Sequence, residues 1–206
     1  MVTRYECLEA VAGVAADALV LHTGGGTAAE FNHLRPGPAN LDCAVGSVTP
    51  MALGLSLALP RRRVVALETD GGILLNLSVL PDLGNLRPPR LTVVVFDNEV
   101  YESTGGQPSA TSGRADLAAL AGAAGVEKTA TARSREEFER TVKEALEDSS
   151  CHFIVAKVEV GAKRVPPLEI SGVEMKFRFV RHIEETEGVR VLSPPEQRIP
   201  EYLVRD

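Results

Sequence analysis

Two polar side chains stand where consecutive strands of the predicted fold end. Asp70 follows an apolar run at residues 63–68, and Asn98 follows a second apolar run at residues 91–96. A helical segment at about residues 74–85 separates the two runs, which together predict a strand-helix-strand unit. Because both strands of such a unit deliver their carboxyl ends to one edge of a parallel sheet, we expect Asp70 and Asn98 to meet there.

The oxygen atoms at this edge are ligands for a small, hard cation. A carboxylate, an amide oxygen and a nearby backbone carbonyl suit Mg²⁺, which completes its coordination with water and substrate phosphates. Gly71 and Gly72 follow Asp70 at the start of the next helix, where free N–H groups and the helix dipole favour an anion. The stretch therefore predicts a metal-bridged diphosphate.

The same stretch resembles the diphosphate-binding signature of thiamine diphosphate enzymes. That signature has an Asp-Gly turn after one strand and an Asn after the next, and here the matching positions are Thr69-Asp70-Gly71 and Asp97-Asn98. The continuation at residues 100–108, VYESTGGQP, resembles one branch in particular, the sulfopyruvate and phosphonopyruvate decarboxylases, with the sulfopyruvate decarboxylase beta subunit among them. The resemblance extends over about residues 20–158. It implies thiamine diphosphate and Mg²⁺ as cofactors.

The resemblance also implies which turns contact the cofactor. Val45 would be the apolar side chain that presses the two cofactor rings into a V shape, unless it is simply a core residue, and the Cys43 carbonyl would accept from the pyrimidine amine. Thr27 and Glu30 match a Gly-x-x-Ser-x-Glu stretch of the family and would form a polar wall. The implied metal ligands are Asp70, Asn98 and the Val100 carbonyl. The implied cofactor contacts are Thr23, Gly24, Thr27, Cys43, Val45, Thr69, Asp70, Gly71, Gly72, Asn98, Val100 and Tyr101.

The family's chemistry implies a subunit of a 2-oxo acid decarboxylase. The cofactor carries the difficult chemistry, because its cationic ring stores the electrons that are released as CO₂ leaves, and the protein supplies position, metal and electrostatics. In the resembling branch the 2-oxo acid carries a sulfonate or phosphonate tail. Ser103 and Thr104 are candidates to line a site for that anion, and a purely structural Gly-rich turn is the alternative.

The glutamate that activates the cofactor belongs, in this family, to a separate pyrimidine-binding domain. The diphosphate-binding domain already occupies residues 1–160, so we expect that glutamate on a partner subunit and the active site at an interface, in a homo-dimer or hetero-oligomer. The catalytic residue itself is therefore unknown from this sequence. Residues 161–206 have a different, Pro-rich and charged texture, and we expect this extension to pack on the domain or on the partner.

Two other functions remain open at this point. A cofactor-binding or scaffold subunit without chemistry is suggested by Thr69, because a β-branched residue replaces the first glycine of the signature. A nicotinamide dinucleotide-binding protein is suggested by Gly24-x-Gly26-x-x-Ala29 after a predicted strand, with Asp42 at a plausible spacing for a ribose contact. Pro36 and Pro38 argue against the dinucleotide fingerprint, because they shorten the helix it requires and make Asp42 follow a loop instead of a strand.

Composition agrees with an ordinary globular enzyme subunit. The chain has 206 residues, of which 44% are hydrophobic and 24% charged, and this balance excludes a disordered chain or a coiled coil. A net charge of −6 without a long basic cluster argues against a nucleic-acid partner. Three widely spaced cysteines, no signal pattern and no membrane-length apolar run predict a cytoplasmic protein without a membrane partner.

Alternating strand and helix patterns predict the fold class. The pattern continues after the central unit with a helix at residues 116–125, a short strand at 126–130 and a final strand at 151–158. We therefore expect an α/β fold, a doubly wound and mostly parallel sheet with helices on both faces.

Overall fold

The computed structural model of the chain describes residues 2–192. Its centre is a parallel sheet of six strands in the order β2-β1-β3-β4-β8-β7. All neighbouring strands in it run parallel, which confirms the predicted fold class. The strands are β1 (Leu19–Thr23), β2 (Asn40–Cys43), β3 (Val64–Thr69), β4 (Leu91–Asp97), β7 (Lys128–Ala132) and β8 (His152–Lys157).

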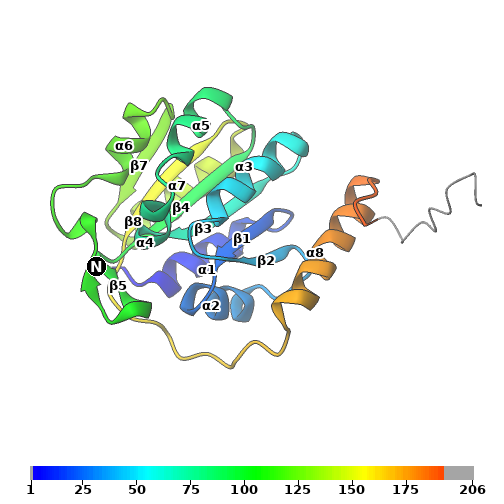
Figure 1. Ribbon diagram of the computed structural model, residues 1–206, viewed down its shortest axis with the longest axis horizontal. Coiled ribbons are helices and arrows are strands. Elements are labelled where there is room, and N and C mark those ends of the chain that lie inside the picture. The colour runs from blue at the N-terminus through cyan, green and yellow to red at the C-terminus, as the bar shows by residue number, and fades with distance from the viewer. Residues whose placement is uncertain (1, 193–206) are drawn as a thin grey trace, which may run out of the picture.

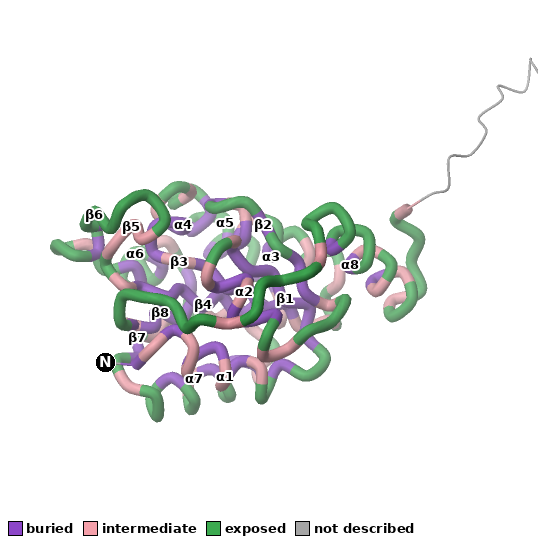
Figure 2. The backbone as a smooth tube through the Cα atoms, turned by 90° about the horizontal axis from the view of Figure 1, so that it is seen from below, coloured by how far each residue is buried: buried purple, intermediate pink, exposed green. Residues whose placement is uncertain are grey.

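Helices cover both faces of this sheet (Figures 1 and 2). One face carries α1 (Arg4–Val14), α2 (Gly26–Leu34) and α7 (Arg135–Glu147). The other carries α3 (Val48–Ala58), α4 (Asp70–Leu75), α5 (Val79–Leu86) and α6 (Leu117–Ala123). Between β4 and α6 the chain forms a small hairpin and two short turns, namely β5 (Val100–Tyr101), η1 (Glu102–Thr104), β6 (Gln107–Pro108) and η2 (Ala110–Ser112).

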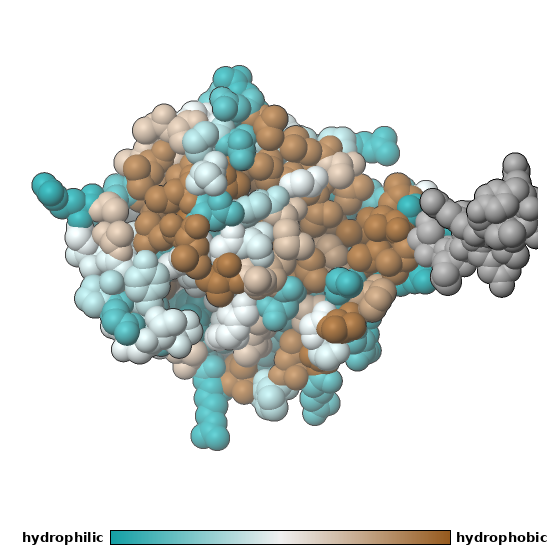
Figure 3. All heavy atoms as spheres, in the orientation of Figure 1, coloured by the Kyte–Doolittle hydropathy of each residue, from teal (hydrophilic) through white to brown (hydrophobic). Residues whose placement is uncertain are grey.

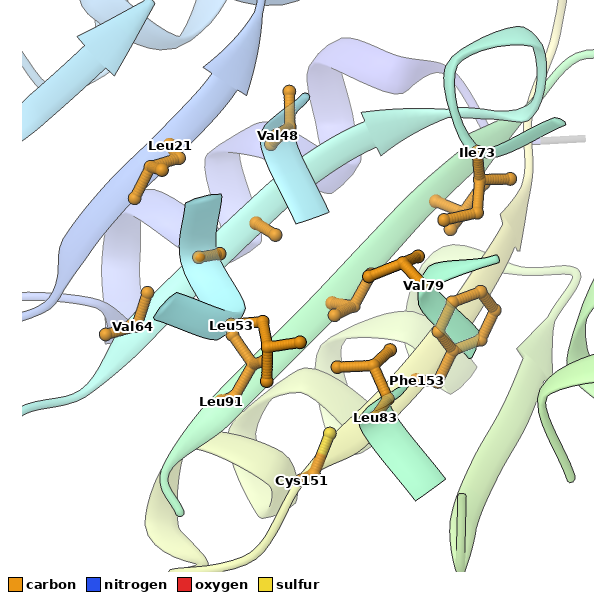
Figure 4. Close-up of a cluster of buried hydrophobic side chains, with 14 of the residues drawn as sticks. Leu21, Val48, Leu53, Val64, Ile73, Val79, Leu83, Leu91, Cys151 and Phe153 are labelled. Carbon is orange, nitrogen blue, oxygen red and sulfur yellow. The ribbon is translucent and has the colours of Figure 1, made fainter. Parts of the chain in front are cut away.

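Two apolar cores hold the layers together. Central strands of a sheet that is covered on both faces are apolar throughout, and alternate residues serve opposite cores. In β3, Val64 and Ala66 enter the core under α3 to α6, whereas Val65 and Leu67 enter the core under α1, α2 and α7. Figure 4 shows the first core, where side chains such as Leu53 fill the space between helices and sheet.

The parallel register brings the ends of four neighbouring strands to one edge. Thr23 pairs with Cys43 across β1 and β2, and Thr69 pairs with Phe96 across β3 and β4. The turns after β1, β2, β3 and β4 therefore open on the same edge, which is where ligands bind in sheets of this kind.

The helix expected at residues 74–85 is wrong in its bounds, because the chain forms two helices there. The first, α4, already begins at Asp70, and α5 begins at Val79. The break between them is held by side chains: Asn76 Nδ2 donates to the Gly46 carbonyl at 3.1 Å, and the Ser78 hydroxyl donates to Asn76 Oδ1 at 2.7 Å. A contact with a loop thirty residues away thus decides where the helix ends.

Two strands also differ from the sequence-based expectation. Asp42 lies within β2 and does not follow a loop, since residues 40–43 pair with β1 directly after the Pro-rich turn. The strand expected at residues 126–130 begins at Lys128, because the Val126 N–H still donates to the Ala121 carbonyl and closes α6.

The segment after β8 crosses the molecule without regular structure and ends in α8 (Gly172–Glu187), beside β2 (Figure 1). Met175, Phe179 and Ile183 are the buried side chains of α8, and Met175 Sδ accepts the N–H of Asp42 at 3.1 Å. The last fourteen residues of the predicted extension, 193–206, lie outside the described residues. Within residues 2–192, every helix is too short or too polar to cross a membrane.

Candidate active site

Asp70 is the first residue of α4 and is almost completely buried, with 1% of its surface exposed. Its Oδ2 accepts a hydrogen bond from the Ser109 hydroxyl at 2.6 Å, and the Thr111 hydroxyl oxygen lies 3.3 Å from the same atom. Burial raises the pKa of Asp70, while the hydrogen bonds from Ser109, the Gly71 N–H and Thr111 act in the opposite direction. The carboxylate is therefore fixed at the edge of the sheet before any ligand is considered.

Thr69 acts as the N-cap of α4. Its Oγ1 accepts the N–H of Gly72 at 3.1 Å, and its backbone has ordinary extended angles, φ −117° and ψ 161°. Thr69 therefore fits the first position of the signature without strain. The Gly72 N–H donates to this cap, and its contact with a diphosphate stays a prediction.

The two glycines after Asp70 give space to larger neighbours. A Cβ on Gly71 would stand 2.8 Å from the ring of Tyr101, and a Cβ on Gly72 would stand 2.0 Å from Glu68 Oε1. Glu68 is fully buried, and burial raises its pKa to about 7. The turn at residues 69–72 thus packs directly between the Tyr101 ring and a buried carboxyl group.

Beyond β4, the chain presents the oxygens expected to hold a metal. Asn98 Oδ1 accepts the N–H of Val100 at 3.1 Å, which fixes the amide in a local turn. Val100 stands opposite Pro108 in the hairpin, and because proline has no N–H, Pro108 offers no donor to the Val100 carbonyl. Asp97 is engaged by other side chains: its Oδ2 lies 2.6 Å from Lys157 Nζ, and its Oδ1 accepts the Thr111 hydroxyl at 2.7 Å.

The turn after β1 differs from the polar wall that the sequence suggested. Thr23 and Thr27 are buried, and Gly24 and Gly25 form the turn itself, with Gly25 at φ +77°. Glu30 is buried in an ion pair with Arg4, 2.8 Å between Oε2 and Nε. Glu30 therefore serves the packing of α1 on α2 and does not line an open wall.

The loop after β2 keeps Val45 in solvent. Val45 is 54% exposed, which excludes the alternative that it is a core residue. The carbonyl of the next residue, Gly46, accepts from Asn76, so this loop is tied to the end of α4. Cys43 lies below it with a buried thiol, whose pKa burial raises to about 12.

Ser103 and Thr104 lie at the exposed tip of the hairpin. The tip turns back through Gly105 and Gly106, both with positive φ, and the Gly106 N–H donates to the Tyr101 carbonyl at 2.9 Å. Both residues are thus exposed at the surface, where the Thr104 hydroxyl lies 3.4 Å from the Tyr101 carbonyl oxygen.

Four residues of this region were missed from the sequence: Ser109, Thr111, Lys157 and Arg4. Ser109 and Thr111 are hydroxyl residues within three positions of the end of the TGGQP motif. Their closeness to this motif was the one signal for them in the sequence. Lys157 ends β8 and Arg4 lies on α1, so only the folded chain brings them to the site.

The oxygen donors suit Mg²⁺. One carboxylate, one amide and one carbonyl are hard ligands, and Mg²⁺ commonly binds to one or two carboxylates together with phosphates and water. In the part of the chain that the structure describes, no three His, Cys, Asp or Glu side chains gather as a metal cluster. The carboxylate of Asp70, the amide of Asn98 and the carbonyl of Val100 are oxygen donors that fit a cation sharing its coordination with a bound phosphate.

Comparison with known proteins decides the family. Residues 27–156 match the family described as thiamine pyrophosphate enzyme, C-terminal TPP binding domain. The chain belongs to this family. The fold and the family predicted from the sequence are confirmed, and so is thiamine diphosphate, another name for thiamine pyrophosphate, as the cofactor.

Relatives of this thiamine pyrophosphate enzyme domain include decarboxylase subunits. The sulfopyruvate decarboxylase subunit beta of Methanocaldococcus jannaschii is 34% identical over 69% of this chain and 75% of that protein. The subunit of the same name from Methanothermobacter thermautotrophicus is 30% identical over 89% of this chain and 96% of that protein. The phosphonopyruvate decarboxylase of Streptomyces viridochromogenes is 30% identical over 82% of this chain and 44% of that protein.

A solved structure agrees with the fold. A putative thiamin diphosphate-dependent enzyme from Mycobacterium smegmatis superposes with a TM-score of 0.68 at 23% identity, over 78% of this chain. This chain spans about a third of that protein, 32% of its length. The predicted decarboxylase class agrees with the names of the relatives, and the beta-subunit names agree with a separate partner subunit.

Proposed function

We propose that this chain is the diphosphate-binding subunit of a thiamine diphosphate-dependent 2-oxo acid decarboxylase. The observation that carries the proposal is the alignment of Asp70, Asn98 and the Val100 carbonyl with the exposed Val45 at one edge of a parallel sheet. Asp70, Asn98 and Val100 would hold Mg²⁺, which would supply the positive charge that the diphosphate needs. Tyr101 and Gly71 would form the adjoining wall.

The bound cofactor would supply the electron sink for loss of CO₂. This chain's residues would hold and orient it: the metal ligands would fix the diphosphate end, Val45 would press on the rings, and the Cys43 carbonyl would accept from the pyrimidine amine. The side chain of Val45 is exposed and stands on a loop anchored by Asn76, so it is available for such a contact. Binding energy at the diphosphate would thereby position the reactive ring.

The pyrimidine-binding half would come from a separate subunit that also supplies the activating glutamate. Apolar side chains are exposed around this edge and on the adjoining helices, and Figure 3 shows apolar surface over the face that carries α3, α4 and α5. Exposed apolar patches of this kind are typical of protein interfaces. The members of this surface are Val45, Met51, Leu57, Leu75, Leu77 and Leu86.

The proposed substrate is a 2-oxo acid with a sulfonate or phosphonate tail. The names of the relatives support this class, and the exposed hydroxyls of Ser103 and Thr104 at the hairpin tip are suited to an anion. We further propose residues 1–160 as the cofactor-binding domain and residues 161–206 as an extension. Three buried free cysteines are consistent with a cytoplasmic location.

A reconstitution assay tests this function. Decarboxylation of sulfopyruvate, phosphonopyruvate and pyruvate is measured with Mg²⁺ and thiamine diphosphate, for the chain alone and with a pyrimidine-binding subunit. We expect CO₂ release only with the partner, and fastest with an anionic-tailed substrate. Full activity of the chain alone would contradict the partner requirement. Absence of both activity and cofactor binding in the complex would favour a scaffold role.

A further inference from the structure

We infer that Ser109 and Thr111 are positioning residues for the metal site, because their hydroxyls fix the orientation of the Asp70 carboxylate. The inference rests on the proposed function, in which Asp70 is a metal ligand. Ser109 immediately precedes the short turn η2, and Thr111 lies within it. The turn follows the hairpin and is far from Asp70 in sequence. Their contact with Asp70 is a product of the fold.

The contacts are short and shielded from water. Ser109 Oγ donates to Asp70 Oδ2 at 2.6 Å, and Thr111 Oγ1 lies 3.3 Å from the same oxygen. The two hydroxyl oxygens are 2.8 Å apart. Each of the two residues is 4% exposed, so water does not compete freely for these hydrogen bonds.

The hydroxyl pair is itself anchored from the other side. Thr111 Oγ1 donates to Asp97 Oδ1 at 2.7 Å, and Asp97 Oδ2 lies 2.6 Å from Lys157 Nζ at the end of β8. A continuous chain of polar contacts therefore runs from β8 through β4 and η2 to the start of α4. This chain leaves the Asp70 carboxylate little freedom to rotate.

The turn does not depend on these hydroxyls for its own shape. Its closing bonds are made by Ser112, whose N–H and hydroxyl donate to the Ser109 carbonyl at 3.2 Å and 2.7 Å. The Ser109 and Thr111 hydroxyls point instead at two carboxylates. Their role is therefore separable from the folding of the turn.

Orientation of a ligating carboxylate matters for Mg²⁺ in particular. This ion requires nearly ideal octahedral geometry, and outer hydrogen-bond partners of metal ligands typically contribute 10- to 100-fold in metal affinity. Removal of either hydroxyl should therefore raise the Mg²⁺ concentration needed to bind the cofactor, without removing a metal ligand.

Matched variants at one position provide the test. Thr111→Val keeps the shape and loses the hydroxyl, whereas Thr111→Ser keeps the hydroxyl and loses a methyl group. Calorimetric titration of thiamine diphosphate into the complex with its partner subunit, at graded Mg²⁺, gives the half-saturating Mg²⁺ concentration. We expect an increase of about 10-fold for Thr111→Val and for Ser109→Ala, and less than about twofold for Thr111→Ser.

Ser112→Ala is the control, because it removes a hydroxyl that does not contact Asp70 while the Ser112 N–H still closes the turn on the Ser109 carbonyl. We expect its Mg²⁺ requirement to match that of the wild type. Equal Mg²⁺ requirements for Thr111→Val and the wild type would overturn the inference, as would equal increases in Thr111→Val and Thr111→Ser. In both of these outcomes the proposed function stands as long as the wild-type complex binds the cofactor. If the wild type binds none, the proposed function and this inference both fail.

Discussion

At the scale of single residues, the site depends on which atoms occupy the space around the turn at residues 69–72. Thr69 replaces a glycine of the family signature without strain, because its backbone is extended and its hydroxyl caps α4. Gly71, in contrast, cannot be replaced by a residue with a side chain without a steric clash. The Tyr101 ring occupies the position a side chain would need, 2.8 Å from an ideal Cβ. A methyl group at Gly71 must displace this ring from the wall of the site.

We predict that Gly71→Ala destabilises the fold by about 1 to 3 kcal/mol, the usual range for overpacking, and weakens cofactor binding in the complex. Urea unfolding and calorimetric titration measure the two effects. Gly13→Ala is the control, since Gly13 is exposed on α1, on the other face of the sheet, and no other side chain or distant backbone lies within 4 Å of the new Cβ. We expect it to leave binding unchanged and to stabilise the helix by up to about 1 kcal/mol. Equal effects of the two variants would show that the contact with Tyr101 has no role.

At the scale of elements, Arg4 connects parts of the chain that are distant in sequence. Its guanidinium binds Glu30 on α2 at 2.8 Å and Glu102 in the hairpin at 3.3 Å. Glu30 also accepts the N–H of Lys163 at 2.6 Å, and Glu102 accepts the N–H of Gly161. α1, α2, the hairpin and the segment after β8 therefore share one polar junction.

We predict that Arg4→Met lowers the free energy of unfolding by about 3 kcal/mol or more, because it leaves the buried Glu30 carboxylate without its cation. Arg87→Met is the matched control: its ion pair with Glu127 is exposed, 3.2 Å between Nη2 and Oε1. We expect it to change stability by no more than about 0.5 kcal/mol. Urea denaturation at neutral pH compares the two, and a similar small loss in both would disprove the role of the junction.

At the scale of the whole molecule, the sheet and its edge could be predicted from the sequence. Central strands are buried on both faces, so they appear as apolar runs, and parallel pairing alone then places Asp70 and Asn98 at the same edge. The structure rules out a core position for Val45, which is 54% exposed, and its contact with the cofactor rings stays a prediction.

Contacts between distant segments could not be predicted in this way. The ion pair of Arg4 with Glu30 and the hydrogen bonds of Ser109 to Asp70 join residues that no periodicity relates. Strand β2 was missed because it has only four residues and follows a Pro-rich turn. The division of the helix after Asp70 depends on the bond from Asn76 to Gly46, which again is visible only in the fold.

The whole chain is thus proposed as one half of an active site, with the metal and diphosphate on its exposed sheet edge. An anomalous difference map of the complex with a pyrimidine-binding subunit, crystallised with thiamine diphosphate and Mn²⁺ in place of Mg²⁺, tests this most directly. We predict a single strong peak within coordination distance of an Asp70 carboxylate oxygen, Asn98 Oδ1 and the Val100 carbonyl. A peak remote from Asp70, or a diphosphate bound at the Gly24 turn instead, would contradict the account.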